Sequence, residues 1–163
     1  MRRTHLILLL VGIVPSPARA QAPAIDGRTG IQAFNRALET ATRGMDNAAM
    51  IALWESGGVS LLPSTMPIVG RTAIGQFMND VTKQLIGARM ESFDLRCFDI
   101  VVSGLLGSEW CLEHQVVVLP AGQPKFDGWG KMLLVLHRGQ DGKWRLIREM
   151  WNQALPDSTA VSH

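Results

Sequence analysis

The chain has 163 residues, a formal net charge of +2 and 47% hydrophobic residues. This length suits one domain with a modest single core. A nearly neutral chain without a run of Lys or Arg has no electrostatic footprint for nucleic acid or an anionic membrane surface, so we expect neither as a partner.

The first twenty residues have the layout of a secretory signal peptide. A basic start over residues 1–5 precedes a continuous apolar run over residues 6–14, and small residues surround Ala20. The apolar run is too short to cross a hydrocarbon core, which needs about twenty residues. Cleavage after Ala20 would remove three arginines and leave 13 basic and 14 acidic residues, a net charge of −1. We therefore expect a signal peptide over residues 1–20, no membrane contact after cleavage, and a periplasmic or secreted protein.

Helical periodicity dominates the next part of the chain. Residues 21–28 are a lead-in, and apolar residues at helical spacing predict a helix over residues 29–43. Asp46 is placed to cap a second, short helix that runs through Trp54 and ends at Gly57-Gly58. A strand pair at residues 59–62 and 68–69 leads into a third helix that begins at Thr72, carries Phe77 on its apolar face and ends at Gly87.

After Gly87 the period of the apolar residues changes from 3.6 to 2. Four long strands follow, separated by turn-forming residues, at residues 90–102, 108–119, 126–138 and 143–152. Helices followed by an antiparallel meander predict an α+β domain over residues 29–153. The polar segment 154–163 is expected to be a disordered tail.

Two segments carry a resemblance to a known family. Asp141-Gly142-Lys143-Trp144 begins a two-faced strand that ends at Trp151-Asn152, and Ile68-Val69-Gly70-Arg71-Thr72 leads into a helix far upstream. In this order the pair resembles the nuclear transport factor 2-like superfamily, in its SnoaL-like branch. The resemblance implies a cone-shaped roll, with three N-terminal helices packed on a curved, mainly antiparallel sheet and a pocket on the concave face. It also implies a homodimer formed through the sheet.

Alternation along the strands predicts which residues share a face. The uniformly apolar set is expected against the helices, and it comprises Met132, Leu134, Leu136 and Leu146. The opposite face is expected to form the dimer interface, through Trp110, His114, Trp129 and Trp151. Centring each hairpin on its turn places Leu134 between Arg148 and Glu113. A single bulge would flip these assignments.

The predicted pocket floor is apolar. Members that resemble ketosteroid isomerase have an Asp base and a Tyr with a protonated Asp as oxyanion donors; the corresponding positions here fall on Leu62 and Leu134, and the chain has no Tyr. That chemistry is therefore disfavoured. The expected ligand-binding residues are Trp54 at the pocket mouth, Leu62, Phe77, Glu113, Gln115, Leu134, Arg148 and Asn152.

Two charged pairs allow both a functional and a structural interpretation. Arg148 is a candidate anchor for a ligand carboxylate and Glu113 a candidate base, although the pair could equally be a structural ion pair. His114 could pair with Glu149 as a general base, or it could simply pack beside Trp at a subunit interface.

Cys97 and Cys111 are equidistant from the turn at Gly104. A three-residue loop would place them directly opposite, where an oxidising compartment would join them; two buried free thiols are the alternative. Because no His or Cys occurs at ligand spacing and no acidic cluster exists, we expect no metal and no cofactor.

These observations lead to two functional hypotheses. The first is an exported small-molecule-binding domain whose apolar cone pocket holds an apolar or carboxylated ligand. The alternative is a small lyase, isomerase, cyclase or hydrolase that acts on a hydrophobic ring compound. The sequence leaves open whether the protein is an enzyme.

Overall fold

The structure is a computed structural model that describes residues 26–120 and 122–156. Its elements are, in chain order, α1 (Gly27–Arg43), α2 (Asn47–Ala52), β1 (Trp54–Leu61), β2 (Ile68–Val69), α3 (Arg71–Gln84), β3 (Arg89–Ser103), β4 (Leu106–Val118), β5 (Phe126–Arg138) and β6 (Trp144–Ala154). The expected signal peptide and the end of the expected tail lie outside the described residues. Within the two described ranges, no helix is both long enough and apolar enough to cross a membrane.

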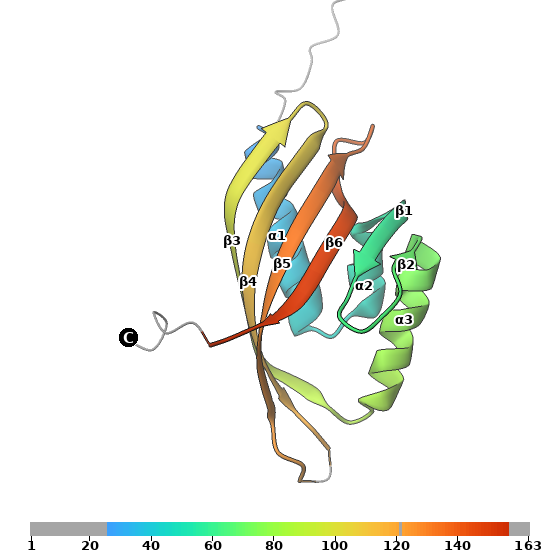
Figure 1. The fold of residues 1–163 in the computed structure, drawn as a ribbon, viewed down its shortest axis with the longest axis vertical. Coiled ribbons are helices and arrows are strands. Elements are labelled where there is room, and N and C mark those ends of the chain that lie inside the picture. The colour runs from blue at the N-terminus through green and yellow to red at the C-terminus, as the bar shows by residue number, and fades with distance from the viewer. Residues whose placement is uncertain (1–25, 121, 157–163) are drawn as a thin grey trace, which may run out of the picture.

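One curved sheet organises the fold (Figure 1). Its strand order is β2-β1-β6-β5-β4-β3, and all neighbours are antiparallel except β1 and β6, which run parallel. Helix α1 packs on β3 and β6, whereas α3 contacts α2, β1 and β2. The expectation of three N-terminal helices packed on the sheet therefore differs from the structure, because α3 follows β1 and β2 and packs at that end of the sheet.

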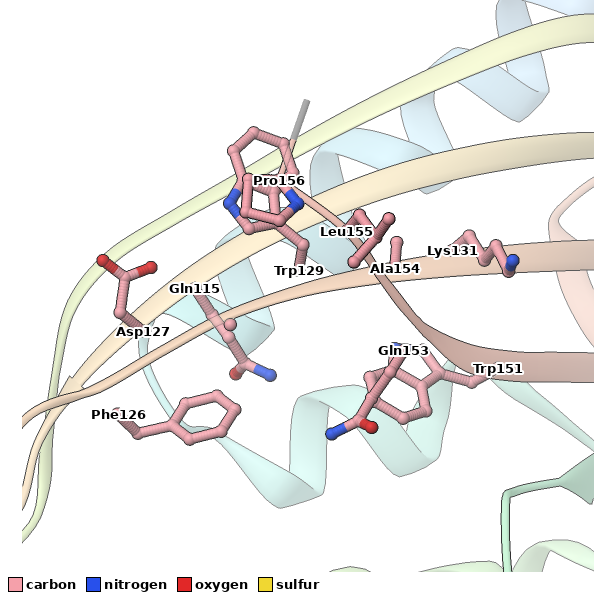
Figure 2. Close-up of a pocket in the computed structure, with 11 residues that line it drawn as sticks. Gln115, Phe126, Asp127, Trp129, Lys131, Trp151, Gln153, Ala154, Leu155 and Pro156 are labelled. Carbon is pink, nitrogen blue, oxygen red and sulfur yellow. The ribbon is translucent and has the colours of Figure 1, made fainter. Parts of the chain in front are cut away.

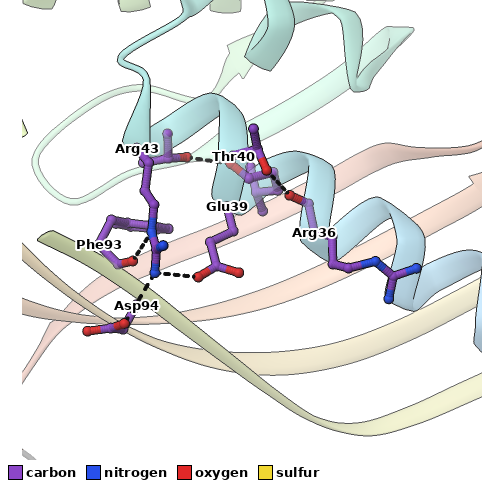
Figure 3. Close-up of polar contacts among 8 residues, drawn as sticks. Arg36, Glu39, Thr40, Arg43, Phe93 and Asp94 are labelled. Carbon is purple, nitrogen blue, oxygen red and sulfur yellow. Dashed lines mark hydrogen bonds and ion pairs between the residues drawn. The ribbon is translucent and has the colours of Figure 1, made fainter.

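Helix α1 is fixed to the sheet by its apolar face and by its last residue. Ile31, Phe34 and Ala41 are buried. Arg43 Nε donates a 2.7 Å hydrogen bond to the Phe93 carbonyl of β3, and its Nη2 lies 2.9 Å from Glu39 Oε1 (Figure 3). Arg43 therefore anchors the C-terminal end of α1 to β3.

The core lies between this helix layer and the concave face of the sheet. It includes the set predicted from strand alternation, since Leu134 and Leu136 are fully buried and Leu146 and Met132 nearly so. Complete burial of one such side chain contributes about 1.5–3 kcal/mol. The remaining buried members are Ile31, Phe34, Trp54, Ile74, Ile100, Cys111 and Trp144.

Trp54 does not lie at a pocket mouth. Helix α2 begins with the predicted cap, in which Asp46 accepts from the Ala49 backbone N–H, but it ends at Ala52. Trp54 starts β1 and is only 2% exposed. Position 58 of this strand is occupied by glycine, and a Cβ there would lie only 2.5 Å from Cε3 of Trp54. Gly58 thus makes room for a core indole, and the prediction that Gly57-Gly58 ends a helix is wrong.

A bulge sets the register of the β3–β4 hairpin. Ser103 and Leu106 are paired across a two-residue turn, a register that would leave Cys97 opposite Leu112. The ladder shifts by one residue between Phe98 and Val101, where Asp99 adopts a positive φ of 52°. Cys97 and Cys111 therefore become direct partners, and the structure has a disulfide between them.

Candidate functional site

The concave face of β4 and β5 carries acidic as well as apolar residues. On β4 the alternating residues Glu109, Cys111 and Glu113 are buried. On β5 the buried residues around the centre are Met132 and Leu134, and Leu134 lies opposite Glu109. Buried carboxyls need partners to offset desolvation, so their surroundings identify the polar part of this face.

A bulge in β6 reverses the predicted orientation of its second half. Leu136 pairs with Leu146, whereas the preceding Val135 pairs with Arg148, so Ile147 is an extra residue. Such an insertion moves every later side chain to the other face. Arg148 is exposed on the face away from the core, and Glu149 is the residue opposite Leu134. The predicted Glu113–Arg148 pair is therefore wrong.

The bulge brings Trp151 into contact with Glu113. The indole Nε1 of Trp151 donates a 2.7 Å hydrogen bond to Oε1 of Glu113, across the intervening strand β5. The two side chains meet over Gly130, where a Cβ would lie 2.5 Å from Trp151 Nε1 and 2.7 Å from Glu113 Oε1. Burial raises the pKa of the Glu113 carboxyl, and the Trp151 hydrogen bond opposes that shift only in part.

Glu149 forms the second part of this polar cluster. Its Oε2 accepts a 2.8 Å hydrogen bond from the hydroxyl of Ser60, its partner on the parallel strand β1. Burial raises the pKa of Glu149; the Ser60 hydrogen bond lowers it, and the nearby charge of Glu113 raises it further. The side chain nevertheless remains partly accessible to solvent. We call Ser60, Glu113, Glu149 and Trp151 the concave carboxyl cluster.

This cluster has the elements of acid–base chemistry. Two carboxyls with raised pKa values keep their protons to a higher pH than free glutamate does, and a protonated carboxyl can donate a hydrogen bond or a proton. The charge of Glu113 contributes to the raised pKa of Glu149, so the two carboxyls lie close enough to interact.

A pocket of about 480 Å³ adjoins this cluster at the C-terminal end of β6. Figure 2 shows Gln115, Phe126 and Trp151 on the helix side of the sheet and Trp129 on the other side. Trp151 thus both lines the pocket and holds Glu113. The other lining residues are Asp127, Gly128, Lys131, Gln153, Ala154, Leu155 and Pro156.

The structure brings together only part of the predicted ligand-binding set. Gln115 lines the pocket and Glu113 lies behind its Trp151 wall. Arg148 and Asn152 belong to the opposite face, because Asn152 pairs with the exposed Lys131. The other predicted residues do not line this pocket. Trp54 and Leu134 lie in the core, Leu62 follows β1, and Phe77 lies on α3.

The prediction of an apolar floor around Leu62 and Leu134, with polarity only from Glu113, Arg148 and Asn152, is also incorrect. Ser60, Glu109 and Glu113 are buried polar residues, and Glu149 joins them on the same face. Sequence alternation found Glu113 but missed Glu149, Ser60 and the inward position of Trp151. No local signal marks the bulge at Ile147, since its neighbours read as a regular strand.

The convex face is the face of the sheet that points away from the helices. It carries three of the four residues expected at a dimer interface. Trp110 is 40% exposed and stacks on Phe98 at a centroid distance of 4.4 Å. His114 stacks on Trp129, and its Nε2 lies 2.7 Å from Asp127 Oδ1 rather than beside Glu149. Trp151, the fourth expected member, points to the concave face.

A second polar group lies farther along the concave face. In the described part of the chain, Cys97, Glu109 and Cys111 form a group of three potential metal ligands whose donor atoms lie within 4.8 Å of one another. The two sulfurs are joined in the disulfide, and a disulfide sulfur is not a thiolate ligand.

Comparisons with known proteins identify the fold. A scan against protein-family models finds no match, and no curated protein matches significantly. A ketosteroid isomerase-like protein from Erwinia carotovora atroseptica is similar, with a TM-score of 0.68 and 19% identity over 78% of this chain and 96% of that one. A nuclear transport factor 2-like protein with a cystatin-like fold from Novosphingobium aromaticivorans has a TM-score of 0.59 and 18% identity, covering 82% and 85% of the two chains.

A third solved structure is a candidate dehydratase of the nuclear transport factor 2-like family from Streptomyces avermitilis. It has a TM-score of 0.64 and 16% identity, over 78% of this chain and 96% of that one. The chain therefore has the nuclear transport factor 2-like fold, as the resemblance implied.

Proposed function

We propose that this chain is an exported small-molecule-binding domain, whose pocket beside Trp151 holds an uncharged apolar or aromatic ligand. The observation that supports this most is the position of Trp151, which lines a pocket of about 480 Å³ and at the same time binds the buried Glu113. Small-molecule sites typically combine an aromatic lining with a few convergent polar groups. Here Phe126 and Trp151 supply the aromatic surface on the helix side of the sheet, and the two glutamines supply hydrogen bonds.

The charges favour a neutral ligand over a carboxylated one. Glu113 and Glu149 lie on the concave face, where they offer a carboxylate ligand no positive charge to pair with. Arg148, the anchor expected for a carboxylate, lies on the other face. Lys131 lines the pocket together with Asp127, so the two opposite charges at its rim balance.

Export and self-association belong to the same proposal. The signal-like residues 1–20 and the Cys97–Cys111 disulfide both fit an oxidising compartment outside the cytoplasm. For a homodimer we propose the convex face around the stacked pair Phe98 and Trp110, with Trp129 and His114 nearby.

A second candidate function is a lyase, isomerase, cyclase or hydrolase reaction on a hydrophobic ring compound. The specific observation in its favour is the two neighbouring carboxyls of Glu113 and Glu149, whose raised pKa values suit general acid–base catalysis. The names of the similar structures, an isomerase-like protein and a candidate dehydratase, are compatible with such chemistry.

Native mass spectrometry of the protein purified from its own host tests the binding proposal. We expect a small neutral molecule bound to the wild-type chain, lost from Trp151→Leu and retained by Arg148→Met, which alters an exposed residue on the opposite face. A ligand retained by Trp151→Leu, or an anion lost from Arg148→Met, would overturn the proposal. If the bound molecule is a substrate, Glu113→Gln and Glu149→Gln should keep binding it and fail to convert it.

A further inference from the structure

The two sulfurs of the disulfide differ sharply in their access to solvent. Cys111 is completely buried. Cys97 is partly exposed and lines a groove of about 420 Å³ between α1 and β3. A reagent that enters this groove therefore reaches Cys97 first, and Cys111 lies behind it.

Glu109 lies beside the disulfide with one oxygen unused. Its side chain is 2% exposed, and a carboxylate oxygen lies within 4.8 Å of both sulfurs. Oε2 accepts a 2.9 Å hydrogen bond from Nδ2 of Asn35, whereas Oε1 is buried and has no hydrogen-bond partner. A buried carboxyl with an unpaired oxygen is costly, and a stable fold gains nothing from it.

We propose that Cys97–Cys111 is a thiol–disulfide exchange site, in which a low-molecular-weight thiol attacks Cys97 from the groove and Glu109 delivers a proton to Cys111. The inference is independent of the function proposed for the pocket beside Trp151. It rests on the unequal access of the two sulfurs and on the buried carboxyl next to them, one oxygen of which has no hydrogen-bond partner.

The exchange balances with a thiol as the reductant. The thiolate sulfur bonds to Sγ of Cys97 as the Cys97–Cys111 bond breaks, and the electron pair leaves on Sγ of Cys111. Glu109 transfers its proton to that sulfur and becomes a carboxylate. A second thiolate attacks the small-molecule sulfur of the mixed disulfide, releasing an oxidised small-molecule disulfide and a Cys97 thiolate.

The surroundings explain why a proton donor is needed. A Cys111 thiolate in the core would be a buried charge, so its departure is unfavourable unless it is protonated. Burial raises the pKa of the Glu109 carboxyl, opposed by the Asn35 hydrogen bond, so it holds a proton to higher pH than a free glutamate.

The charged groups of the groove are few. From β5, the residue opposite Glu109 is the apolar Leu134. From α1, the groove carries Arg36 and Glu39, and Glu39 is engaged by Arg43 at 2.9 Å. The side chain of Arg36 extends away from that ion pair in Figure 3. Arg36 therefore supplies the positive charge that attracts an anionic thiolate.

The test uses the full chain with reduced glutathione, quenched with acid and analysed by mass spectrometry. We expect the mixed disulfide on Cys97 and not on Cys111, in the wild-type protein without denaturant. Glu109→Gln should slow reduction tenfold or more at mildly acidic pH, because a positioned acid contributes roughly 100-fold or more. This difference should shrink as Glu109 loses its proton at higher pH. Glu91→Gln, an exposed change on the same strand as Cys97, should not alter the rate.

Three results would overturn the proposal: glutathione found on Cys111, equal rates for wild type and Glu109→Gln, or a rate that follows global unfolding in urea. A Glu109→Gln chain that merely folds poorly would be reduced faster, which is the opposite of the expected change. Mapping which cysteine carries glutathione uses the wild-type protein, so this result tests the proposal even if the variant folds poorly.

Discussion

Glu149 lies directly opposite Leu134 on the neighbouring strand, the place that an unbroken hairpin would give to Arg148. This single-residue shift places a second carboxyl and the Trp151 indole on the concave face and moves the cation to the convex face. The site changes from a predicted ion pair into a carboxyl pair with raised pKa values.

The contact between Glu113 and Trp151 depends on Gly130. Gly130→Ala would place a Cβ against both side chains, so we expect a loss of about 1–3 kcal/mol in the free energy of unfolding from overpacking. Gly57→Ala on β1 is the matched control, since a Cβ there meets nothing within 4 Å. Its effect should stay within about 0.5 kcal/mol in urea titrations. Equal effects of the two variants would show that Glu113 and Trp151 do not meet over Gly130.

Glu149 should make stability depend on pH in a defined direction. Burial raises its folded-state pKa above the ordinary value of 4.5, so the folded chain holds this proton longer than the unfolded chain does. The contribution to stability is fully present below 4.5 and is lost as pH rises through the folded pKa.

Glu149→Gln removes the carboxyl whose ionisation causes this loss of stability. Its free energy of unfolding, relative to wild type, should therefore increase as pH rises through the same window. Glu91→Gln, which removes only an exposed ion pair with Lys125, should show no such increase. Chemical denaturation at a series of pH values measures both. A relative stability that falls with rising pH would mean that Glu149 is ionised and stabilising in the fold.

The disulfide should contribute substantially to stability. It joins residues 14 apart in sequence, and cross-linking a loop of this length stabilises by about 3 kcal/mol. The double variant Cys97→Ala, Cys111→Ala should unfold at correspondingly lower urea concentration. An unchanged midpoint would imply that the two cysteines are not joined in the folded protein.

Self-association through the convex face predicts a specific sensitivity to charge. Leu133 is 49% exposed there, so Leu133→Glu should convert a dimer into a monomer in sedimentation velocity experiments. Val69→Glu on β2 is a control of similar exposure, at 64%, and should leave the dimer intact. A wild-type chain that is monomeric at high micromolar concentration would exclude the proposed interface.

Strand alternation was sufficient for the part of the site that lies before the β6 bulge. It correctly placed Met132, Leu134, Leu136 and Leu146 against the helices, because this face is more uniformly apolar than the opposite one, which carries Lys131 and His137. It failed after Ile147, because the extra residue is fixed by pairing with both β5 and β1 and leaves no mark in the local sequence.

Trp54 was missed for a different reason. The glycines at 57 and 58 normally indicate the end of an element, yet here they are strand residues, and Gly58 leaves room for the indole. That requirement arises from packing against α1 and α3, which are distant in sequence. The disulfide partners were found by symmetry about Gly104, but the turn is one residue shorter than the symmetric loop, and the bulge at Asp99 compensates.

Calorimetric titration with 2-naphthol and 2-naphthoate tests the central claim most directly, because the two probes share one ring system and differ in charge. With Glu113 and Glu149 beside the pocket and Arg148 on the other face, 2-naphthol should bind at neutral pH at least tenfold more tightly than 2-naphthoate, a difference of about 1.4 kcal/mol. Trp151→Leu should abolish naphthol binding and Arg148→Met should leave it unchanged. Tighter binding of 2-naphthoate, lost selectively in Arg148→Met, would contradict the account.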